Sequence, residues 1–198
     1  MREFRTEDTS TLYRVSLLTG DNGHDAEHLY DDGDLLGHLW LGPYLALEPE
    51  MARVVDDGAG EAVGFVVAAL DTARFEQRCE IEWWPPLRDR YRNPYSSAQP
   101  WSPDEEAMAH IHRPERTDVL LTLDFPSHLH IALLPEGQGR GWGRRLIEWV
   151  CAELEHRGSP GVHLGVDDGN DHAIGFYRHL GFAEIDGYEG GIVFGRRF

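Results

Sequence analysis

The chain of 198 residues contains no lysine, so each of its 18 basic residues is an arginine. Acidic residues are about twice as numerous, 35 against 18, and the formal net charge at pH 7 is −17. A charge of this sign and size repels a phosphate backbone, which argues against nucleic acid as a partner. The missing lysine also excludes a P-loop nucleotide site, in which a lysine follows the last glycine.

Cysteines and long apolar segments are also scarce. The two cysteines, Cys79 and Cys151, have neither the spacing of a metal site nor that of a disulfide framework, so we expect reduced thiols and no metal. No apolar stretch approaches the roughly 18–20 residues that span a bilayer, and no signal peptide is recognisable. These features predict a cytoplasmic protein without a membrane partner, and the length predicts a single domain over residues 1–198.

The most informative segment is glycine-rich and runs from Gln138 to Gly143. Before it, the apolar run from His128 to Leu134 predicts a strand that Pro135 ends. Behind it, apolar residues recur at helical spacing; they are Leu146, Ile147, Val150, Cys151 and Leu154. A glycine-rich loop between a strand and a helix directs unpaired N–H groups at one point, at the positive end of the helix dipole. The segment therefore predicts a phosphate-binding site.

The glycine spacing narrows the choice of phosphate ligand. A dinucleotide fingerprint needs Gly-x-Gly-x-x-Gly, but Trp142 or Arg144 stands where the last glycine belongs, depending on where the count starts. What remains is Gln-x-x-Gly-x-Gly, with Arg140, Arg144 and Arg145 as a local basic cluster inside an acidic chain. Such a cluster suits a ligand with several phosphate charges.

A second segment lies about 30 residues further on, from Asn170 to Phe182. It combines Asn-x-x-Ala-x-x-x-Tyr with Leu-Gly-Phe; Asn170 suits a helix N-cap, and Gly181 suits the left-handed residue after a helix. In this order and spacing, the two segments resemble the coenzyme-binding motifs of the GNAT acyltransferases, which bind acetyl-coenzyme A.

This resemblance implies a GNAT fold, an α/β architecture with a mixed central sheet flanked by helices. It implies acetyl-coenzyme A as co-substrate and a set of coenzyme-binding residues: Ile131, Leu133, Gln138, Gly139, Arg140, Gly141, Trp142, Gly143, Arg144, Asn170 and Tyr177. In the family, the asparagine lies near the pantetheine arm and the tyrosine near the sulfur. A phenol with a pKa near 10 stays protonated at neutral pH, so Tyr177 is the candidate general acid for the leaving thiolate.

Further segments resemble a narrower group, the bacterial acetyltransferases similar to the acetyltransferase-like C-terminal domain of O-GlcNAc hydrolases. They cover nearly the whole chain and are residues 30–37, 42–44, 84–87, 126–130 and 161–166. In the eukaryotic enzymes that domain is regarded as a pseudo-acetyltransferase with a damaged coenzyme loop, whereas the loop is intact here.

The remaining helices and strands are predicted from the hydrophobic periodicity and from the glycine and proline residues that interrupt it. Helices are predicted over residues 9–18, 35–41 and 103–112, and strands over 51–55, 63–70, 162–166, 183–185 and 192–194. Residues 71–117 form a long insertion before the coenzyme-binding strand, and residues 117–123 are where we expect it to rejoin the sheet. Within the insertion, Trp83-Trp84-Pro85-Pro86 is expected to break regular structure.

The sequence does not identify the residue that acts as the base and removes a proton from the acceptor. His128 and His130 lie on the strand beside the expected reaction centre, and we take His130 as the candidate because histidine titrates near neutrality. Carboxylates near strand ends are equally admissible, namely Asp71, Glu80, Glu82 and Asp124. His-x-His also resembles part of a zinc site, but no supporting third ligand is evident.

These features together predict an acetyl-coenzyme A-dependent N-acetyltransferase. An amine of a small molecule or peptide would attack the thioester directly within a ternary complex, and the acidic surface favours a cationic acceptor. The insertion and the acidic loop of residues 20–33 are expected to form the acceptor site. A non-catalytic coenzyme-binding or interaction module and an O-acyl or longer-acyl transferase are the alternatives, and the protein is expected to be a monomer or homodimer.

Overall fold

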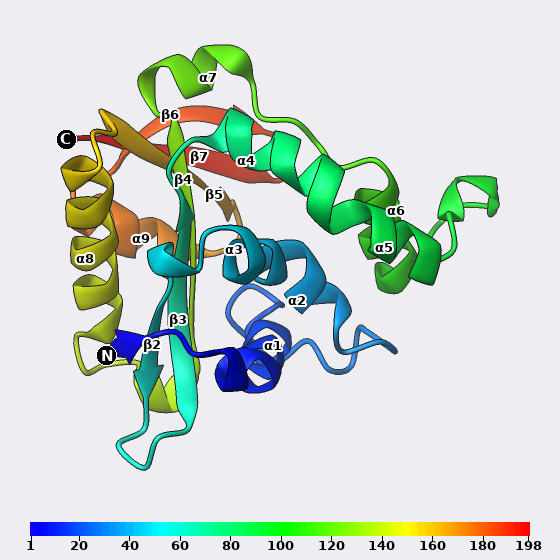
Figure 1. Cartoon of the computed structure of the whole chain (residues 1–198), viewed down its shortest axis with the longest axis horizontal. Helices are drawn as coiled ribbons and strands as arrows, with labels where there is room; N and C mark the ends of the chain where they lie inside the picture. Colours follow the sequence, from blue (N-terminus) through cyan, green and yellow to red (C-terminus); the bar gives the residue numbers. More distant parts are fainter.

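A single seven-stranded sheet with helices on both faces organises the chain in the computed structural model, which describes residues 1–198 (Figure 1). The strands are β1 (Arg2–Glu3), β2 (Arg53–Asp56), β3 (Ala62–Ala69), β4 (Ser127–Leu133), β5 (Gly161–Asp167), β6 (Ala183–Tyr188) and β7 (Gly191–Arg197). Their order is β1-β2-β3-β4-β5-β7-β6, and β4 with β5 is the one parallel pair. The expected mixed sheet is therefore confirmed.

The helices divide between the two faces of this sheet. They are α1 (Thr9–Leu18), α2 (Leu35–Trp40), α3 (Gly42–Leu47), α4 (Thr72–Arg78), α5 (Trp84–Arg90), α6 (Pro103–His112), α7 (Val119–Asp124), α8 (Trp142–His156) and α9 (Asp171–His179). In Figure 1, α8 and α9 cover one face, and α1 to α3 cover the other together with the insertion. No helix has the length and apolar character needed to cross a membrane.

Two hydrophobic clusters, one on each face, fill the space between sheet and helices. Strand β3 is buried at every position because it contributes to both. Its Phe65 and Val67 pack in the cluster with α1 to α3, and Val66 packs in the cluster with α8 and α9. The amphipathic α8 buries the apolar residues that its spacing predicted, including Cys151, and both cysteines are free thiols.

The same alternation fixes the direction of the histidines on β4. Leu129, Ile131 and Leu133 join the cluster under α8 and α9. Successive side chains of a strand point to opposite faces, so His128 and His130 point to the face of α1 to α3. The insertion packs on that face too, because residues such as Phe75 and Trp84 belong to its cluster. The insertion therefore lies beside the two histidines.

Several predicted elements are confirmed and others need correction. Helices α1 and α6 have the predicted bounds, and Ser102 forms the capping box with Glu105. Residues 119–124 are helical, so the expectation that the insertion rejoins the sheet at 117–123 is wrong, and it rejoins at Ser127. Trp83-Trp84-Pro85-Pro86 does not break regular structure: α5 begins there with proline in its first turn, where the missing N–H costs nothing.

Candidate active site

The sheet opens between its two parallel strands. Strands β4 and β5 pair only at their first residues, Ser127 with Val162 and His128 with His163, whereas β3 stays paired with β4 as far as Leu133. We call the opening the β4–β5 fork and define it by residues 129–133 and 164–167. The glycine loop and α8 come directly after β4 in the chain, so they begin at the open end of this fork.

The backbone of β4 presents hydrogen-bonding groups to the fork. The Leu134 N–H donates to the Val63 carbonyl at 2.9 Å, so residues 134, 132 and 130 bond to β3. The N–H groups of Ile131 and Leu133 then point away from β3, into the fork. Gln138 donates its side-chain amide to the Leu133 carbonyl at 2.9 Å, which holds the glycine loop at the end of the fork.

The glycine loop offers a row of free amides. Gly139 and Gly141 are left-handed, with φ of +70° and +76°, and a Cβ added to either would meet no atom within 4 Å. The N–H groups of residues 139–144 make no hydrogen bond within the protein; the next amide, of Arg145, donates to the Gly141 carbonyl at 3.1 Å. The loop therefore has the open backbone that a phosphate ligand requires.

Side chains around the loop have different roles. Arg140 makes no ion pair or hydrogen bond within the protein, whereas Arg144 lies 2.7 Å from His179 and 3.4 Å from Glu148. The Arg145 guanidinium stacks 4.9 Å from the Trp142 ring centre. A further role belongs to Gly143: an added Cβ would lie 3.2 Å from the Phe176 ring, so this glycine lets α8 approach α9.

The second motif places Asn170 and Tyr177 on α9. The Asn170 side-chain oxygen accepts the Ala173 N–H at 3.0 Å, which confirms it as the helix cap. Tyr177 is 6% exposed, and its ring packs against Phe182 and Phe194. Its hydroxyl makes no hydrogen bond within the protein, and burial raises the pKa of Tyr177 well above its usual value. The phenol is therefore neutral at pH 7 and has a proton to donate.

Hydrogen-bond geometry fixes the tautomer of His128. Thr72 Oγ1 lies 2.7 Å from the Pro126 carbonyl, which can only accept, so the single hydroxyl proton is used there. Thr72 Oγ1 must then accept from His128 Nδ1, also at 2.7 Å. His128 Nε2 consequently carries no proton and accepts the Tyr44 hydroxyl at 2.6 Å. Both ring nitrogens of His128 are occupied, so His128 has none for a substrate.

His130 differs from its neighbour in having no partner. Its ring lies 5.4 Å from that of Trp40 and 5.5 Å from that of Tyr44, and neither nitrogen makes a hydrogen bond within the protein. Burial lowers the pKa of His130 to about 4, because the charged form is poorly solvated there. His130 is therefore neutral at pH 7, with a free lone pair beside the fork.

The four carboxylates left open by the sequence are already engaged. Asp71 caps α4 by accepting the Arg74 N–H, and the other three form ion pairs: Glu80 with Arg88 at 3.0 Å, Glu82 with Arg78 at 2.9 Å and Asp124 with Arg197 at 2.9 Å. The arginine partners lower the pKa of Glu80 and of Glu82, because the cation stabilises the ionised carboxylate, and both are thereby weaker bases. Among the candidate bases, His130 alone is uncommitted.

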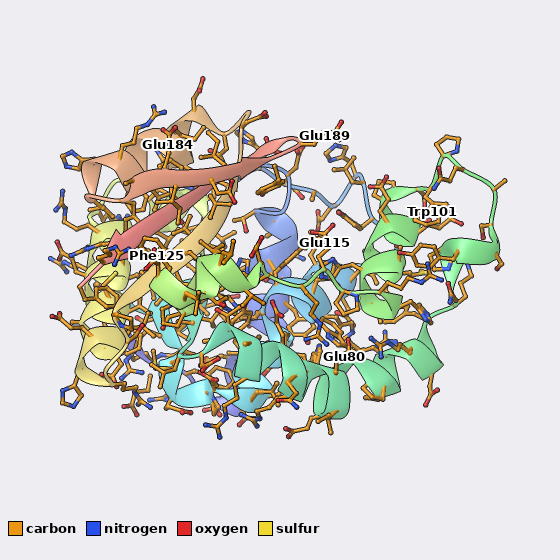
Figure 2. All side chains as sticks on the ribbon, turned by 90° about the horizontal axis from the view of Figure 1, so that it is seen from above. Glu80, Trp101, Glu115, Phe125, Glu184 and Glu189 are labelled. Atoms are coloured by element: carbon orange, nitrogen blue, oxygen red, sulfur yellow. The ribbon has the colours of Figure 1, made fainter.

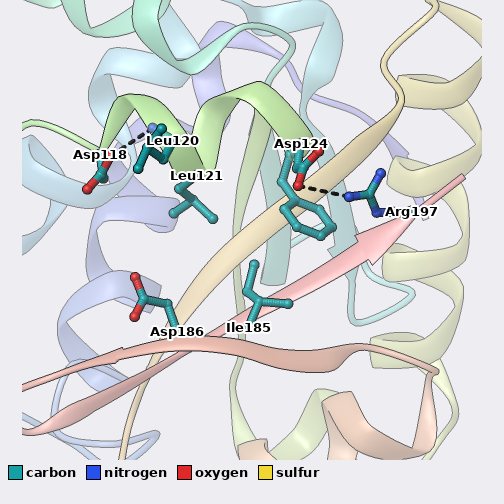
Figure 3. A pocket seen from close by; sticks show the side chains of 8 residues that line it. Asp118, Leu120, Leu121, Asp124, Ile185, Asp186 and Arg197 are labelled. Carbon is teal, nitrogen blue, oxygen red and sulfur yellow. Dashed lines mark hydrogen bonds and ion pairs between the residues drawn. The ribbon is translucent and has the colours of Figure 1, made fainter.

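The surface also has a hollow that lies away from the fork and the glycine loop. It has a volume of about 490 Å³ and lies between α7 and the β6–β7 hairpin (Figure 3). Its lining residues are Asp118, Leu120, Leu121, Asp124, Phe125, Ile185, Asp186 and Arg197, none of which belongs to the fork or the glycine loop. The hollow is therefore separate from the site described above.

The sequence analysis did not identify Thr72 and Tyr44 as partners of His128. Thr72 is 56 residues from His128 in the chain, and Tyr44 is 84 residues away. The one available signal was Gly42-Pro43-Tyr44, which was noted as part of a resemblance and not as a site. His110, on helix α6 of the insertion, is a further residue that the sequence analysis did not select; its ring lies 5.1 Å from that of Trp40 and is only partly exposed.

A mixed sheet that forks between β4 and β5, with a glycine loop and helix behind the fork, is the fold of an acetyltransferase. Residues 6–182 match the model of the acetyltransferase (GNAT) family, so the chain belongs to this family. Members of the family use acetyl-coenzyme A as co-substrate and bind a separate acceptor.

Individual relatives differ in how much of each chain is shared. A crystal structure of SsHAT is similar over 99% of this chain and 96% of that one, with a TM-score of 0.92 and 41% identity. Protein O-GlcNAcase of Rattus norvegicus is 24% identical over 96% of this chain, which spans only 20% of that protein. The [ribosomal protein bS18]-alanine N-acetyltransferase of Salmonella typhimurium is 42% identical over 64 residues, 32% of this chain and 43% of that enzyme.

Proposed function

We propose that this chain is an N-acetyltransferase that transfers an acetyl group from acetyl-coenzyme A to a primary amine, within one domain over residues 1–198. The observation that carries the proposal is the uncommitted His130 beside the fork, on the same strand that leads into the intact glycine loop. One substrate would be held by the loop and the other on the face of His130. Holding both in one complex lowers the barrier by proximity.

On the coenzyme side, the pyrophosphate binds the amides of residues 139–144, and Arg140 and Arg144 supply positive charge. The pantetheine arm enters the β4–β5 fork next to Asn170. In this position the thioester oxygen accepts hydrogen bonds from the N–H groups of Ile131 or Leu133. These donors stabilise the oxyanion that forms during attack.

In the reaction, the amine nitrogen attacks the thioester carbon, and the carbon–sulfur bond then breaks. The Tyr177 hydroxyl gives its proton to the leaving thiolate. A histidine with a pKa of about 4 is too weak to deprotonate an alkylammonium ion, so the acceptor must reach His130 as a neutral amine. After attack the nitrogen is positively charged and far more acidic, and His130 then accepts its proton.

The charge of the protein bears on the class of acceptor. A net charge of −17 gives the protein a negative long-range electrostatic field. This field attracts cations and so favours a cationic acceptor. Both a small amine and a peptide amine satisfy this condition. The named activity of the bS18-alanine N-acetyltransferase relative makes a peptide with an N-terminal alanine a useful member of any acceptor panel.

The test measures coenzyme A thiol release from acetyl-coenzyme A with a panel of small amines, basic peptides and alcohols. Release that requires an amine and yields the N-acetyl product is the expected result. Binding of acetyl-coenzyme A without any acceptor-dependent release would instead indicate a non-catalytic coenzyme-binding module. Release with alcohols alone would indicate an O-acyltransferase.

A further inference from the structure

Three aromatic side chains from separate parts of the chain gather beside His130. Trp40, the last residue of α2, lies between two histidines: its ring centre is 5.4 Å from that of His130 and 5.1 Å from that of His110. His110 comes from α6 of the insertion. The ring centre of Trp84, on α5, lies 6.3 Å from that of His110. We call Trp40 and His110 the aromatic wall.

The aromatic wall has polar groups and ring surface that the protein itself leaves unused. The Trp40 side chain is 40% exposed, whereas Trp84 behind the wall is 6% exposed. Neither Trp40 nor His110 makes a hydrogen bond within the protein. The exposed part of the Trp40 indole, next to the candidate base, is available to pack against a bound molecule.

A carboxylate contributes to the electrostatics near the wall, and the nearby arginines are engaged elsewhere: Arg88 pairs with Glu80, and Arg116 with Glu76 and Glu80. Burial lowers the pKa of His110, and the Glu115 carboxylate opposes that shift, so Glu115 lies close to it. Glu115 also raises the pKa of Tyr188, at the end of β6, as do Asp167 and Asp168. In Figure 2, Glu115 lies on the segment of the insertion after α6, and Glu189 lies at the tip of the β6–β7 hairpin.

Tyr188 connects these carboxylates to the fork. A Cβ added to Gly165 of β5 would lie 3.1 Å from the Tyr188 hydroxyl, so the tyrosine covers β5, the strand across the fork from that of His130. His130 itself lies beside the rings of Trp40 and Tyr44, and Tyr188 with its neighbouring carboxylates lies over the other strand of the fork. Ring faces combined with carboxylates recognise an alkylammonium ion.

We propose that Trp40 and His110 bind the acceptor and select an aliphatic amine that carries a second cationic group. The neutral reacting amine meets His130, while the second ammonium packs on Trp40, hydrogen-bonds to His110 and is balanced by Glu115. Both histidines lie next to the same indole, with ring centres 5.1 Å (His110) and 5.4 Å (His130) from that of Trp40, so one short aliphatic chain bearing two nitrogens suits the pair. The inference rests on the proposed function, in which the acetyl group is transferred to an amine.

The experiment compares 1,4-diaminobutane with 1-aminobutane, which differ by the terminal ammonium. We expect the parent protein to acetylate the diamine with about tenfold higher kcat/KM, and Trp40→Leu to reduce this preference to about twofold or less. Glu115→Gln should weaken the preference through KM, whereas Glu61→Gln on the exposed β2–β3 hairpin should not. Equal acetylation of both amines by the parent would overturn the inference and leave the proposed function standing.

A binding measurement gives a readout without turnover. Calorimetry with coenzyme A present should detect 1,4-diaminobutane binding to the parent protein and at least tenfold weaker binding to Trp40→Leu. Unchanged coenzyme A affinity in that variant shows that it is folded. Binding that depends on Trp40, without acetylation of any amine, would support the aromatic wall and contradict the proposed function. If 1,4-diaminobutane binds equally well to the parent protein and to Trp40→Leu, that result contradicts the aromatic wall and leaves the proposed function standing.

Discussion

The glycine loop offers a controlled test of coenzyme binding, because α8 has a left-handed glycine at each end. Gly141 has φ of +76° before the helix, and Gly158 has φ of +90° after it. A Cβ added to either meets no protein atom within 4 Å, so in both cases Gly→Ala costs only the backbone strain. That strain is about 1–2 kcal/mol, equivalent to a fall in Tm of about 2–8 °C for a chain of this size.

The two substitutions should differ only when the coenzyme is present. The new methyl group at Gly141 projects from the row of unbonded amides at residues 139–144, where the phosphate must approach. We expect Gly141→Ala to weaken coenzyme A binding at least tenfold, or about 1.4 kcal/mol, in a calorimetric titration. Gly158→Ala should bind within about twofold of the parent protein, because no free amide row adjoins it.

The comparison has outcomes that refute the argument. If Gly141→Ala is folded and binds coenzyme A as tightly as the parent does, the pyrophosphate does not lie on this loop. If both variants lose affinity equally, the effect comes from a strained helix and carries no information about a ligand. Thermal unfolding of each variant without coenzyme provides the necessary reference.

Three further predictions concern the chemistry. Tyr177→Phe keeps the ring in its aromatic surroundings, so coenzyme binding should persist while turnover falls roughly 10²–10⁴-fold; a change of only a few-fold would mean another proton donor. ¹⁵N NMR should place the ring proton of His128 on Nδ1; Thr72→Val should lose the hydrogen bond that holds it and Thr72→Ser should keep it, whereas an Nε2 proton in the parent would contradict the assignment. His130 is held below its unfolded pKa of about 6.5, at about 4, so the unfolded chain binds more protons and stability must fall as the pH drops from 6.5 towards 4. Urea unfolding should detect this fall, and His130→Gln should show less of it.

The parts of the fold that the sequence predicted are those with a strong local period or cap. Helix α6 has the predicted bounds because Ser102 and the proline after it act on adjacent backbone groups. Helix α7 was missed for the opposite reason: it buries no residue, and Val119, Leu120 and Leu123 are 71–74% exposed. Without a buried face there is no amphipathic period to recognise.

The two sides of the candidate site differ in how much the sequence says about them. The segments proposed to bind the coenzyme are continuous stretches, in which strand, loop and helix follow one another, so their spacing along the chain is enough to select them. The choice of base depended on contacts between distant segments, because Thr72 and Tyr44 engage His128 and arginines engage the carboxylates. No pattern along the chain distinguishes His130 from His128; the difference is that both ring nitrogens of His128 have hydrogen-bond partners and those of His130 have none.

The insertion takes part on the acceptor side in three ways. Its first helical residue, Thr72, sets the tautomer of His128 and so holds Tyr44, whose ring packs beside His130. Its helix α6 supplies His110, and the segment after α6 supplies Glu115. A chain that kept the coenzyme loop and lost residues 71–117 would retain the phosphate-binding backbone but lose the support of the base and half of the aromatic wall. If the proposed function holds, coenzyme binding and acceptor choice depend on separate segments, and one can change without the other.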